Sequence, residues 1–326
     1  MSLKAIAAVL GLSVTTVSRA LNGYQDVARE TRKRIEEEAQ RRGYRPNAAA
    51  RRLKTGRANA VGFVYPIGAS PLNGSDFSDM LLALEHHLAR YDINLLLLAD
   101  KQQSQSTLTR LLRSGAVDAL IVGHTTPEDS RLHALLQTNF RFLALGRSDL
   151  PSTYAWFDVD HLAGSQLAVG WSLAQGRQRI AWLGSNENST RVRDRRQGYL
   201  TALGEVTPYA MAAVAPSRRA GYQQTREWLA EGPVPEVIIT DCAALAEGAA
   251  LALQLAGSAA GEGAILLAGW EGLPRDAILD HPIVAIRQAT PHQAGEQVAE
   301  MVIRLIDGAP PETLQTLWQP WLQLPA

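Results

Sequence analysis

Side chains that can hydrogen-bond to a nucleic acid are concentrated in residues 13–23, SVTTVSRALNG. An arginine donates two hydrogen bonds to guanine, and a valine can contact the methyl group of thymine. Hydroxyl and amide groups commonly bind phosphates, which set the register of a protein on DNA. We therefore expect six side chains to contact DNA, the first three at base edges and the others at phosphates: Val14, Thr15, Arg19, Thr16, Ser18 and Asn22.

These side chains need a short helix to present them. Apolar residues recur at helical spacing from Leu3 to Leu10, and Gly11 permits a tight turn. Ser2 and Ser13 stand where the first two helices would be capped. A third helix is expected over residues 29–42, with three further side chains closing the small core: Ile35, Ala39 and Tyr44. This order of helices predicts a helix-turn-helix DNA-binding domain over residues 1–45.

The charge distribution points the same way. Residues 1–57 hold 13 lysines and arginines against 5 acidic residues, whereas the whole chain has a net charge of zero. A basic segment of net +8 on a body of net −8 is typical of a protein that binds a polyanion. Charge alone is equally compatible with a solvated surface. The helix order decides in favour of double-stranded DNA.

Residues 46–58 form a candidate hinge. Pro46 cannot extend the preceding helix, Asn47 can cap a new one, and the following alanines favour helix. Six or seven residues are too few for a stable isolated helix, so this one should fold only against a partner. Leu53 beside cations such as Arg51 suits a wedge between base steps in the minor groove. The alternative is a flexible basic linker.

Residues 59–326 alternate short apolar runs with amphipathic stretches. The runs are AVGFVY, INLLLLA, VDALIVG, FRFLALG, RIAWLG, EVIIT and AILLAG. Such alternation predicts parallel, doubly wound sheets, and the length of this segment predicts two α/β lobes. We expect the chain to cross between the lobes near Asp160 and to return near Gln288.

Ligands of such sheets bind beyond the carboxyl ends of the strands. Carboxylates and arginines there give directional hydrogen bonds to sugar hydroxyls, and an indole face can stack on a pyranose ring. A neutral mono- or disaccharide is therefore the expected ligand, bound by Ser70, Asp76, Phe77, Arg147, Asp160, Arg195, Asp241, Trp270 and Glu271. A purine or nucleoside is the alternative, since Trp156, Trp182 and Trp270 could stack on a base.

Several protein classes are disfavoured. The sequence has no GxSxG elbow, P-loop, HExxH or metal-spaced Cys/His cluster, so we expect no enzymatic activity, cofactor or metal. A single cysteine, Cys242, fits a reducing cytoplasm. No run of eighteen apolar residues indicates a membrane span. An exported sugar-binding protein remains the rival class, but it would not need the basic N-terminal domain.

The motifs SVTTVSRALNG, TRKRI and GYRPNAAARRL, with Val27, resemble the DNA-binding domain of the lactose-repressor family of bacterial regulators. The resemblance places Val14, Thr15 and Arg19 at base-reading positions. It implies a hinge helix that forms on operator DNA with Leu53 intercalated. It also implies a body similar to a periplasmic sugar-binding protein, and a regulator, most simply a repressor, that binds a palindromic operator as a homodimer.

Four positions depart from the family pattern. Ala28 precedes the third helix, where the family usually has a polar cap residue. RRQGY is not a departure: it matches the family pattern and places the key arginine at Arg195. In GWEG, Glu271 takes the place of an aspartate; Asp241-Cys242 stands for an Asn-Asp pair; and His161 replaces an asparagine after Asp160. The three departures in the body bear on which sugar is recognised, and the departure at Ala28 bears on the cap of the third helix. All four leave the family resemblance intact.

Overall fold

The computed structural model describes residues 2–21, 26–44, 56–66, 75–100, 105–258, 263–279 and 281–325. It divides into two compact units, Met1–Ala58 and Asn59–Ala326, called here the head and the body. Within the described residues, no single helix is long and apolar enough to cross a membrane; only the first two helices, bent by 110°, pass that test as a pair.

The described residues of the head form the three helices predicted for the DNA-binding domain: α1 (Leu3–Leu10), α2 (Val14–Leu21) and α3 (Arg29–Arg41). Gly11 ends α1 in the left-handed conformation, with φ of 64°, which an L side chain adopts at a cost. The bend of 110° between α1 and α2 lies in the range of helix-turn-helix motifs. One small apolar core holds the helices together, formed by Ile6, Ala7, Val17, Ala20, Val27, Ile35 and Ala39, with Tyr44 packed against it.

The helix caps were predicted only in part. The amide N–H of Thr16 donates to Ser13 Oγ at 3.0 Å, so Ser13 caps α2 as expected. Ser2 stands at the start of α1, but its side chain makes no capping hydrogen bond, which corrects the expectation. Ala28 likewise gives α3 no side-chain cap. Helix α3 therefore depends on its buried contacts through Ile35 and Ala39.

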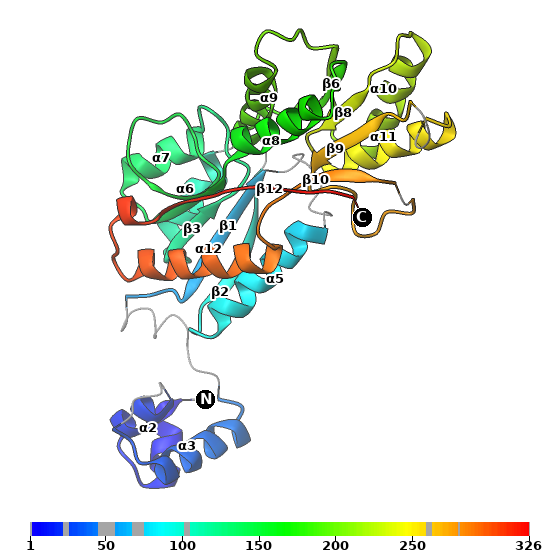
Figure 1. The fold of residues 1–326 in the computed structure, drawn as a ribbon. Coiled ribbons are helices and arrows are strands. Elements are labelled where there is room, and N and C mark those ends of the chain that lie inside the picture. The colour runs from blue at the N-terminus through cyan, green and yellow to red at the C-terminus, as the bar shows by residue number, and fades with distance from the viewer. Residues whose placement is uncertain are drawn as a thin grey trace. The chain divides into compact units, whose positions relative to one another are not determined.

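The body contains two six-stranded sheets, which confirms the expected doubly wound α/β class (Figure 1). The lobe 1 sheet has the order β11-β5-β4-β3-β1-β2 and is parallel throughout. The lobe 2 sheet has the order β12-β10-β9-β8-β6-β7, and only β12 runs antiparallel. The strands of lobe 1 are β1 (Ala60–Pro66), β2 (Asn94–Asp100), β3 (Ala119–Val122), β4 (Phe142–Leu145), β5 (Ala155–Val159) and β11 (Gln315–Trp318). Those of lobe 2 are β6 (Ile180–Ser185), β7 (Ala210–Val214), β8 (Val237–Thr240), β9 (Leu266–Trp270), β10 (Ile283–Arg287) and β12 (Trp321–Gln323).

Helices cover both sheets. In lobe 1, α5 and α12 pack side by side, and Gly295 of α12 lies so close to α5 that a Cβ there would meet the Met80 carbonyl at 2.4 Å (Figure 1). In lobe 2, α8 packs on α9 and α10 on α11. The helices are α5 (Ser75–Ala89), α6 (Gln105–Ser114), α7 (Ser130–Thr138), α8 (His161–Ala174), α9 (Thr190–Leu203), α10 (Arg218–Ala230), α11 (Ala243–Leu255) and α12 (Pro291–Ile306), with a short 3-10 turn at Pro311–Thr313.

The chain passes between the lobes three times. Strand β5 ends at Val159 and α8 begins lobe 2 at His161, whereas β10 ends at Arg287 and α12 returns to lobe 1 at Pro291. These are the two crossings predicted near Asp160 and Gln288. A third crossing joins β11 to β12, between Trp318 and Trp321. Each lobe is therefore built from separate segments of the chain, and the crossings are natural hinges.

Candidate functional sites

Helix α2 presents a polar face outside the core of the head. Val17 and Ala20 are buried, whereas Thr15 is exposed and Thr16 and Ser18 are partly exposed. Val14 is 39% exposed although it is apolar, and it stands at the start of the helix. An exposed valine beside hydroxyl groups suits contact with a thymine methyl group. The structure thus places on one short helix the described side chains that the sequence singled out.

Arg19 has a partner that the sequence did not reveal. Its guanidinium forms an ion pair with the carboxylate of Asp26, and both side chains are about half exposed. An exposed pair of this kind contributes about 1 kcal/mol or less, so Arg19 can exchange it for a base or a phosphate. Asp26 lies in the turn before α3, and only the folded head brings it to Arg19. Five of the predicted contact residues lie outside the described residues: Asn22, Asn47, Arg51, Leu53 and Ser70.

A chain of polar contacts connects the two lobes of the body. In lobe 1, Arg147 Nε donates to Asp158 Oδ2 at 2.8 Å. His161 Nε2, at the start of lobe 2, lies 3.4 Å from Asp158 Oδ1, and Arg195 Nε of α9 donates to His161 Nδ1 at 3.3 Å. The Arg195 guanidinium also donates to the backbone carbonyl of Asp241, which follows β8. We call the set Arg147, Asp158, His161, Glu187, Arg191, Arg195, Asp241 and Glu271 the interlobe polar cluster.

His161 is the neutral link in this chain. Burial, with the nearby Arg195 guanidinium, lowers the pKa of His161 to about 4. Because an arginine can only donate, Nδ1 must accept from Arg195, and Nε2 carries the proton that faces Asp158. Burial works against ionisation of Asp158, but hydrogen bonds from His161 and Arg147 outweigh it and hold the pKa of that carboxyl below its usual value.

The lowered pKa of His161 predicts a pH-dependent stability. The unfolded chain binds a proton at this histidine below about pH 6.5, whereas the folded chain does so only below about 4. The unfolded state therefore holds more protons in this window, and stability falls as the pH drops from 6.5 to 4, by about 3 kcal/mol. His124 is half-buried, partial burial lowers its pKa to about 4 as well, and it adds to the same loss.

Urea unfolding of the intact protein at several pH values measures this loss. His161→Gln keeps one donor and one acceptor and should make the loss of stability between pH 6.5 and 4 clearly smaller. The control is His86→Gln, because His86 is an exposed histidine on α5. An unchanged slope in His161→Gln would show that this residue is not held neutral in the folded protein.

Asp241 carries the least satisfied group of the cluster. Its side chain is 1% exposed, and Oδ2 accepts a hydrogen bond from the amide of Ser185 at 2.7 Å. The other oxygen, Oδ1, is buried without a hydrogen-bond partner. Burial raises the pKa of this carboxyl. An unpaired buried oxygen is costly, so a ligand that donates a hydrogen bond to Oδ1 would gain binding energy here.

Arg195 and Trp270 form a buried stack, which changes the role expected for the tryptophan. Trp270 is 0% exposed, its ring centroid lies 4.0 Å from Arg195 Cζ, and its Nε1 donates to Ser165 Oγ at 3.2 Å. Arg195 therefore covers one face of the indole, and the side chain is fully buried. The expectation that Trp270 stacks on a sugar ring is wrong for this conformation. Trp270 instead holds Arg195 in place. Burial, with Arg191 nearby, lowers the pKa of Arg195 to about 10.

Asp160 also has a different role from the one expected. Its Oδ1 accepts from the amide of Ala163 at 2.9 Å, so it caps the first turn of α8. The carboxylate that joins the cluster is Asp158, two residues earlier, at the end of β5. Alternation along a strand sends these two side chains to the same face, but Asp160 lies beyond the strand and serves the helix.

Asp76 and Phe77, at the start of α5, lie near the facing side of lobe 2. Arg275 of lobe 2 contacts Asp76 at 3.6 Å and Asp79 at 3.0 Å. Phe77 packs against Tyr65 with ring centroids 5.1 Å apart. Asp76 therefore takes part in an ion pair between the lobes.

Glu271 adopts a left-handed backbone with φ of 69°, and its carboxylate acts electrostatically on Arg191 and Arg195.

Two members of the cluster, Glu187 and Arg191, and two residues on which they act were not predicted. Glu187 accepts from Arg191 at 2.9 Å, and three carboxylates, Glu187 first, raise the pKa of Arg191 although burial alone would lower it. Arg191 and Glu187 also act on the titration of two lobe 1 residues, Tyr65 near the end of β1 and His124 after β3. Glu187 and His124 each follow a strand within two residues, so the strand-end rule could have found these two.

Models of two protein families match the chain. "Bacterial regulatory proteins, lacI family" matches residues 2–47, and "Periplasmic binding proteins and sugar binding domain of LacI family" matches residues 58–318. The HTH-type transcriptional regulator RafR of Escherichia coli is 46% identical over 98% of this chain and 96% of its own length. The regulator AglR of Rhizobium meliloti is 33% identical over 98% and 91%.

A solved structure of the Lac repressor bound to ONPG has a TM-score of 0.85, with 23% identity, and covers 100% of this chain and 98% of its own. At that identity the likeness supports the fold alone. The family models and the curated relatives extend over both the head and the body. The chain therefore belongs to the LacI family and is a transcriptional regulator with a helix-turn-helix DNA-binding domain.

Proposed function

We propose that the protein is a repressor that binds a palindromic operator as a homodimer and is controlled by a neutral saccharide held between the lobes. The observation that carries the effector proposal is the buried, unpartnered Oδ1 of Asp241 within the interlobe polar cluster. The matching family description names a sugar-binding domain. A sugar hydroxyl is a donor that a buried carboxylate oxygen of this kind would bind.

The pairing of the cluster's arginines favours a neutral ligand. Arg147 is paired with Asp158, Arg191 with Glu187, and Arg195 donates to His161 and to the Asp241 carbonyl. A phosphorylated sugar would require cations whose donor groups are not already engaged, whereas two of these arginines are paired with carboxylates and the third donates to two acceptors of the protein. Here the least satisfied group is an acceptor, which repels an anion and attracts a hydroxyl.

The aromatic residues give little support to a purine effector. Trp182 is buried against Tyr199 in the core of lobe 2, and Trp270 is covered by Arg195. Trp156 of lobe 1 lies under the Arg147 guanidinium, with Cζ 5.5 Å from the ring centroid. Trp182 and Trp270 are buried, and Arg147 lies over the ring of the partly exposed Trp156, so the described conformation offers a base few stacking partners beside the cluster.

Hydrogen bonds and ion pairs between the lobes would break or re-form if the effector changed the angle between the lobes. The amide of Thr190 donates to the Thr125 carbonyl at 3.0 Å, Arg193 pairs with Asp149, and Arg275 pairs with Asp79. A saccharide that binds one lobe angle better than another would shift the protein toward that angle, by no more than its difference in affinity. The shift would alter the spacing of the two heads on the operator.

The homodimer is supported by apolar side chains that the described body leaves exposed. They lie on α5 and the turn after it, on the edge strand β2, on α11 and in the loop after β9: Leu82, Tyr91, Leu96, Leu97, Leu251, Leu255 and Ile278. A second copy of the chain would cover them. A two-fold dimer also matches a palindromic operator, since each head would read one half-site.

Arg19→Ala should relax operator specificity at one base position in each half-site and cost about 1–3 kcal/mol per lost contact. Binding to a set of operators with single substitutions measures this preference. The matched control is Arg34→Ala, which removes a positive charge from α3, outside the helix that presents the predicted base contacts. If Arg19→Ala kept the wild-type order of preferences, Arg19 would contact only the phosphate backbone.

A ligand panel tests the effector proposal. Galactose, maltose, cellobiose, sucrose, fructose 1-phosphate and hypoxanthine are added separately, and the thermal unfolding midpoint is recorded. A ligand at a hundred times its dissociation constant adds about 2.7 kcal/mol, which should raise the midpoint by several degrees at this chain length. A shift with a neutral sugar supports the proposal, whereas a shift only with hypoxanthine or the sugar phosphate refutes it.

A further inference from the structure

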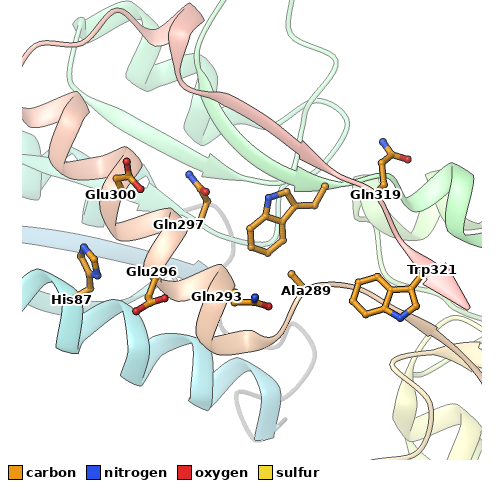
Figure 2. Close-up of a pocket in the computed structure, with 9 residues that line it drawn as sticks. His87, Ala289, Gln293, Glu296, Gln297, Glu300, Gln319 and Trp321 are labelled. Carbon is orange, nitrogen blue, oxygen red and sulfur yellow. The ribbon is translucent and has the colours of Figure 1, made fainter. Parts of the chain in front are cut away.

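A cavity of about 610 Å³ opens at the crossings between the lobes (Figure 2). Its lining comes from α12, from His87 on α5 and from the two connections that join the lobes near the C-terminal strands. None of the residues of the interlobe polar cluster lines it. A cavity of this volume is within the range that binds small ligands.

The cavity touches both returning connections at their midpoints. Ala289 lies in the segment that leaves β10 for α12, and Gln319 lies between β11 and β12. These connections run side by side, because Arg287 of β10 pairs with Trp321 of β12 in the antiparallel ladder. A ligand in the cavity would therefore contact two of the three segments about which the lobes can move.

One face of α12 supplies amides and carboxylates. Four side chains at helical spacing line the cavity: Gln293, Glu296, Gln297 and Glu300. Gln293 is fixed in place, since its Oε1 accepts from the amide of Thr290 at 3.0 Å as part of the cap of α12. Gln319 adds a third amide from the opposite wall. Amides offer both donors and acceptors, which a hydroxyl-rich ligand requires.

Two indoles complete the lining. Trp318 is held edge-on by Phe157, with ring centroids 4.7 Å apart. Trp321 is 49% exposed, and Figure 2 shows its indole beside Ala289. An indole that exposes half of its surface on an edge strand is unusual for a residue with a purely structural role. Its apolar face, beside amides and carboxylates, matches the alternating C–H and O–H groups of a sugar ring.

We propose that this cavity is a second ligand site, separate from the interlobe polar cluster, and that it takes a neutral saccharide. Glu296 and Glu300 disfavour phosphates and other anions. A small organic cation would use the indoles and the carboxylates but would leave the donor groups of the three amides without acceptors. A saccharide uses all three kinds of group.

A ligand in this site would contact both connections and restrict their movement relative to each other. A ligand that fits only one arrangement of the connections stabilises the corresponding lobe angle, and any effect on the affinity of the interlobe site must be reciprocal. The second site would then tune the response to the effector without contacting it.

The test uses the intact protein labelled with 5-fluorotryptophan, in the wild type and in Asp241→Asn, which weakens the interlobe site. Trp321→Phe assigns the Trp321 fluorine resonance. Maltose, cellobiose, sucrose and galactose are titrated, with tetramethylammonium as the cationic comparison. We expect one saccharide to shift the Trp321 resonance in both proteins. Trp321→Ala and Gln297→Leu should weaken the calorimetric binding at this site by at least tenfold, whereas Leu324→Ala, an exposed residue outside the cavity, should not.

Two results would overturn the proposal: a Trp321 resonance that no saccharide moves in either protein, or one that moves only with tetramethylammonium. Asp241→Asn acts on the interlobe site alone. If the effector proposal is wrong, saccharide affinity at the interlobe site will be unchanged in this variant, and this result is independent of the Trp321 resonance.

Discussion

Asp241→Asn should weaken effector binding by about 10- to 100-fold and leave operator binding unchanged. The amide oxygen can keep the hydrogen bond from the Ser185 amide, so the new NH₂ group takes the place of Oδ1. A buried acceptor becomes a donor, and the ligand hydroxyl loses a hydrogen bond to a charged group, worth about 1.5–3 kcal/mol. Calorimetry with the saccharide found in the panel measures the affinity, and a labelled operator measures DNA binding.

Glu236→Gln is the matched control for this variant. Glu236 precedes β8 just as Asp241 follows it, and its carboxylate also accepts backbone amides, those of Gln178 and Arg179. It lies at the opposite end of the same strand, so effector affinity should not change. The unfolding midpoint of Asp241→Asn without ligand should not fall, because burial already disfavours the ionised carboxyl. Wild-type affinity in Asp241→Asn would remove Oδ1 from the effector site.

Replacing the exposed leucines of α11 with glutamates should convert the proposed homodimer to a monomer and lower operator affinity by about 10²- to 10⁴-fold. Leu251 and Leu255 are 39% and 69% exposed and lie one turn apart on α11. Burying a carboxylate at a two-fold interface is costly, since each substitution appears on both partners. A monomer binds only one half-site. In a dimer, the second head is held near the second half-site at a high effective concentration, and this raises operator affinity.

Light scattering after size exclusion gives the mass, for which one chain is 35.4 kDa. The control carries glutamates at Leu167 and Leu324, which are 41% and 54% exposed but lie on α8 and in the C-terminal segment after β12. It should keep the mass of two chains and the wild-type operator affinity. A Leu251→Glu, Leu255→Glu double variant that stays dimeric would place the interface elsewhere.

The three described helices of the head could be predicted nearly completely, because their signals are local. Helical spacing of apolar residues, the left-handed Gly11 and the Ser13 cap all lie within a few residues of the structure they produce. Ser2 failed as a cap because a residue of the right type at the right position does not fix the direction of its side chain. The Arg19–Asp26 pair depends on the fold of the whole head.

In the body, continuous apolar runs predicted β1–β4, β6, β8 and β9, whereas the central strand β10 and weaker patterns were missed. Strand β7, with the sequence AMAAV, is rich in residues that favour helix and is held as a strand by its parallel pairing with β6. Helix α10 has a polar sequence and packs on α11, where Gly248 lies so close that a Cβ would meet the Arg218 carbonyl at 2.1 Å. Both elements are set by their tertiary neighbours.

The strand-end rule located Arg147, Arg195, Asp241 and Glu271 within the cluster, and it could not assign the other roles. Asp160 and Trp270 have the chemistry of ligand-binding residues, but one caps a helix and the other supports Arg195. His161 joins the lobes through contacts on both ring nitrogens, and these depend on Asp158 and Arg195 arriving from different lobes. Such roles follow from the crossing of the chain between the lobes.

The most direct test of the central claim is an operator-binding titration of the intact protein, with and without the saccharide that shifts its unfolding midpoint. We predict that a saturating amount of this sugar lowers operator affinity at least tenfold in the wild type. In Asp241→Asn, a sugar concentration 10- to 100-fold higher should be needed for the same release. Operator affinity that no neutral sugar changes, in either direction, would contradict a saccharide-controlled regulator.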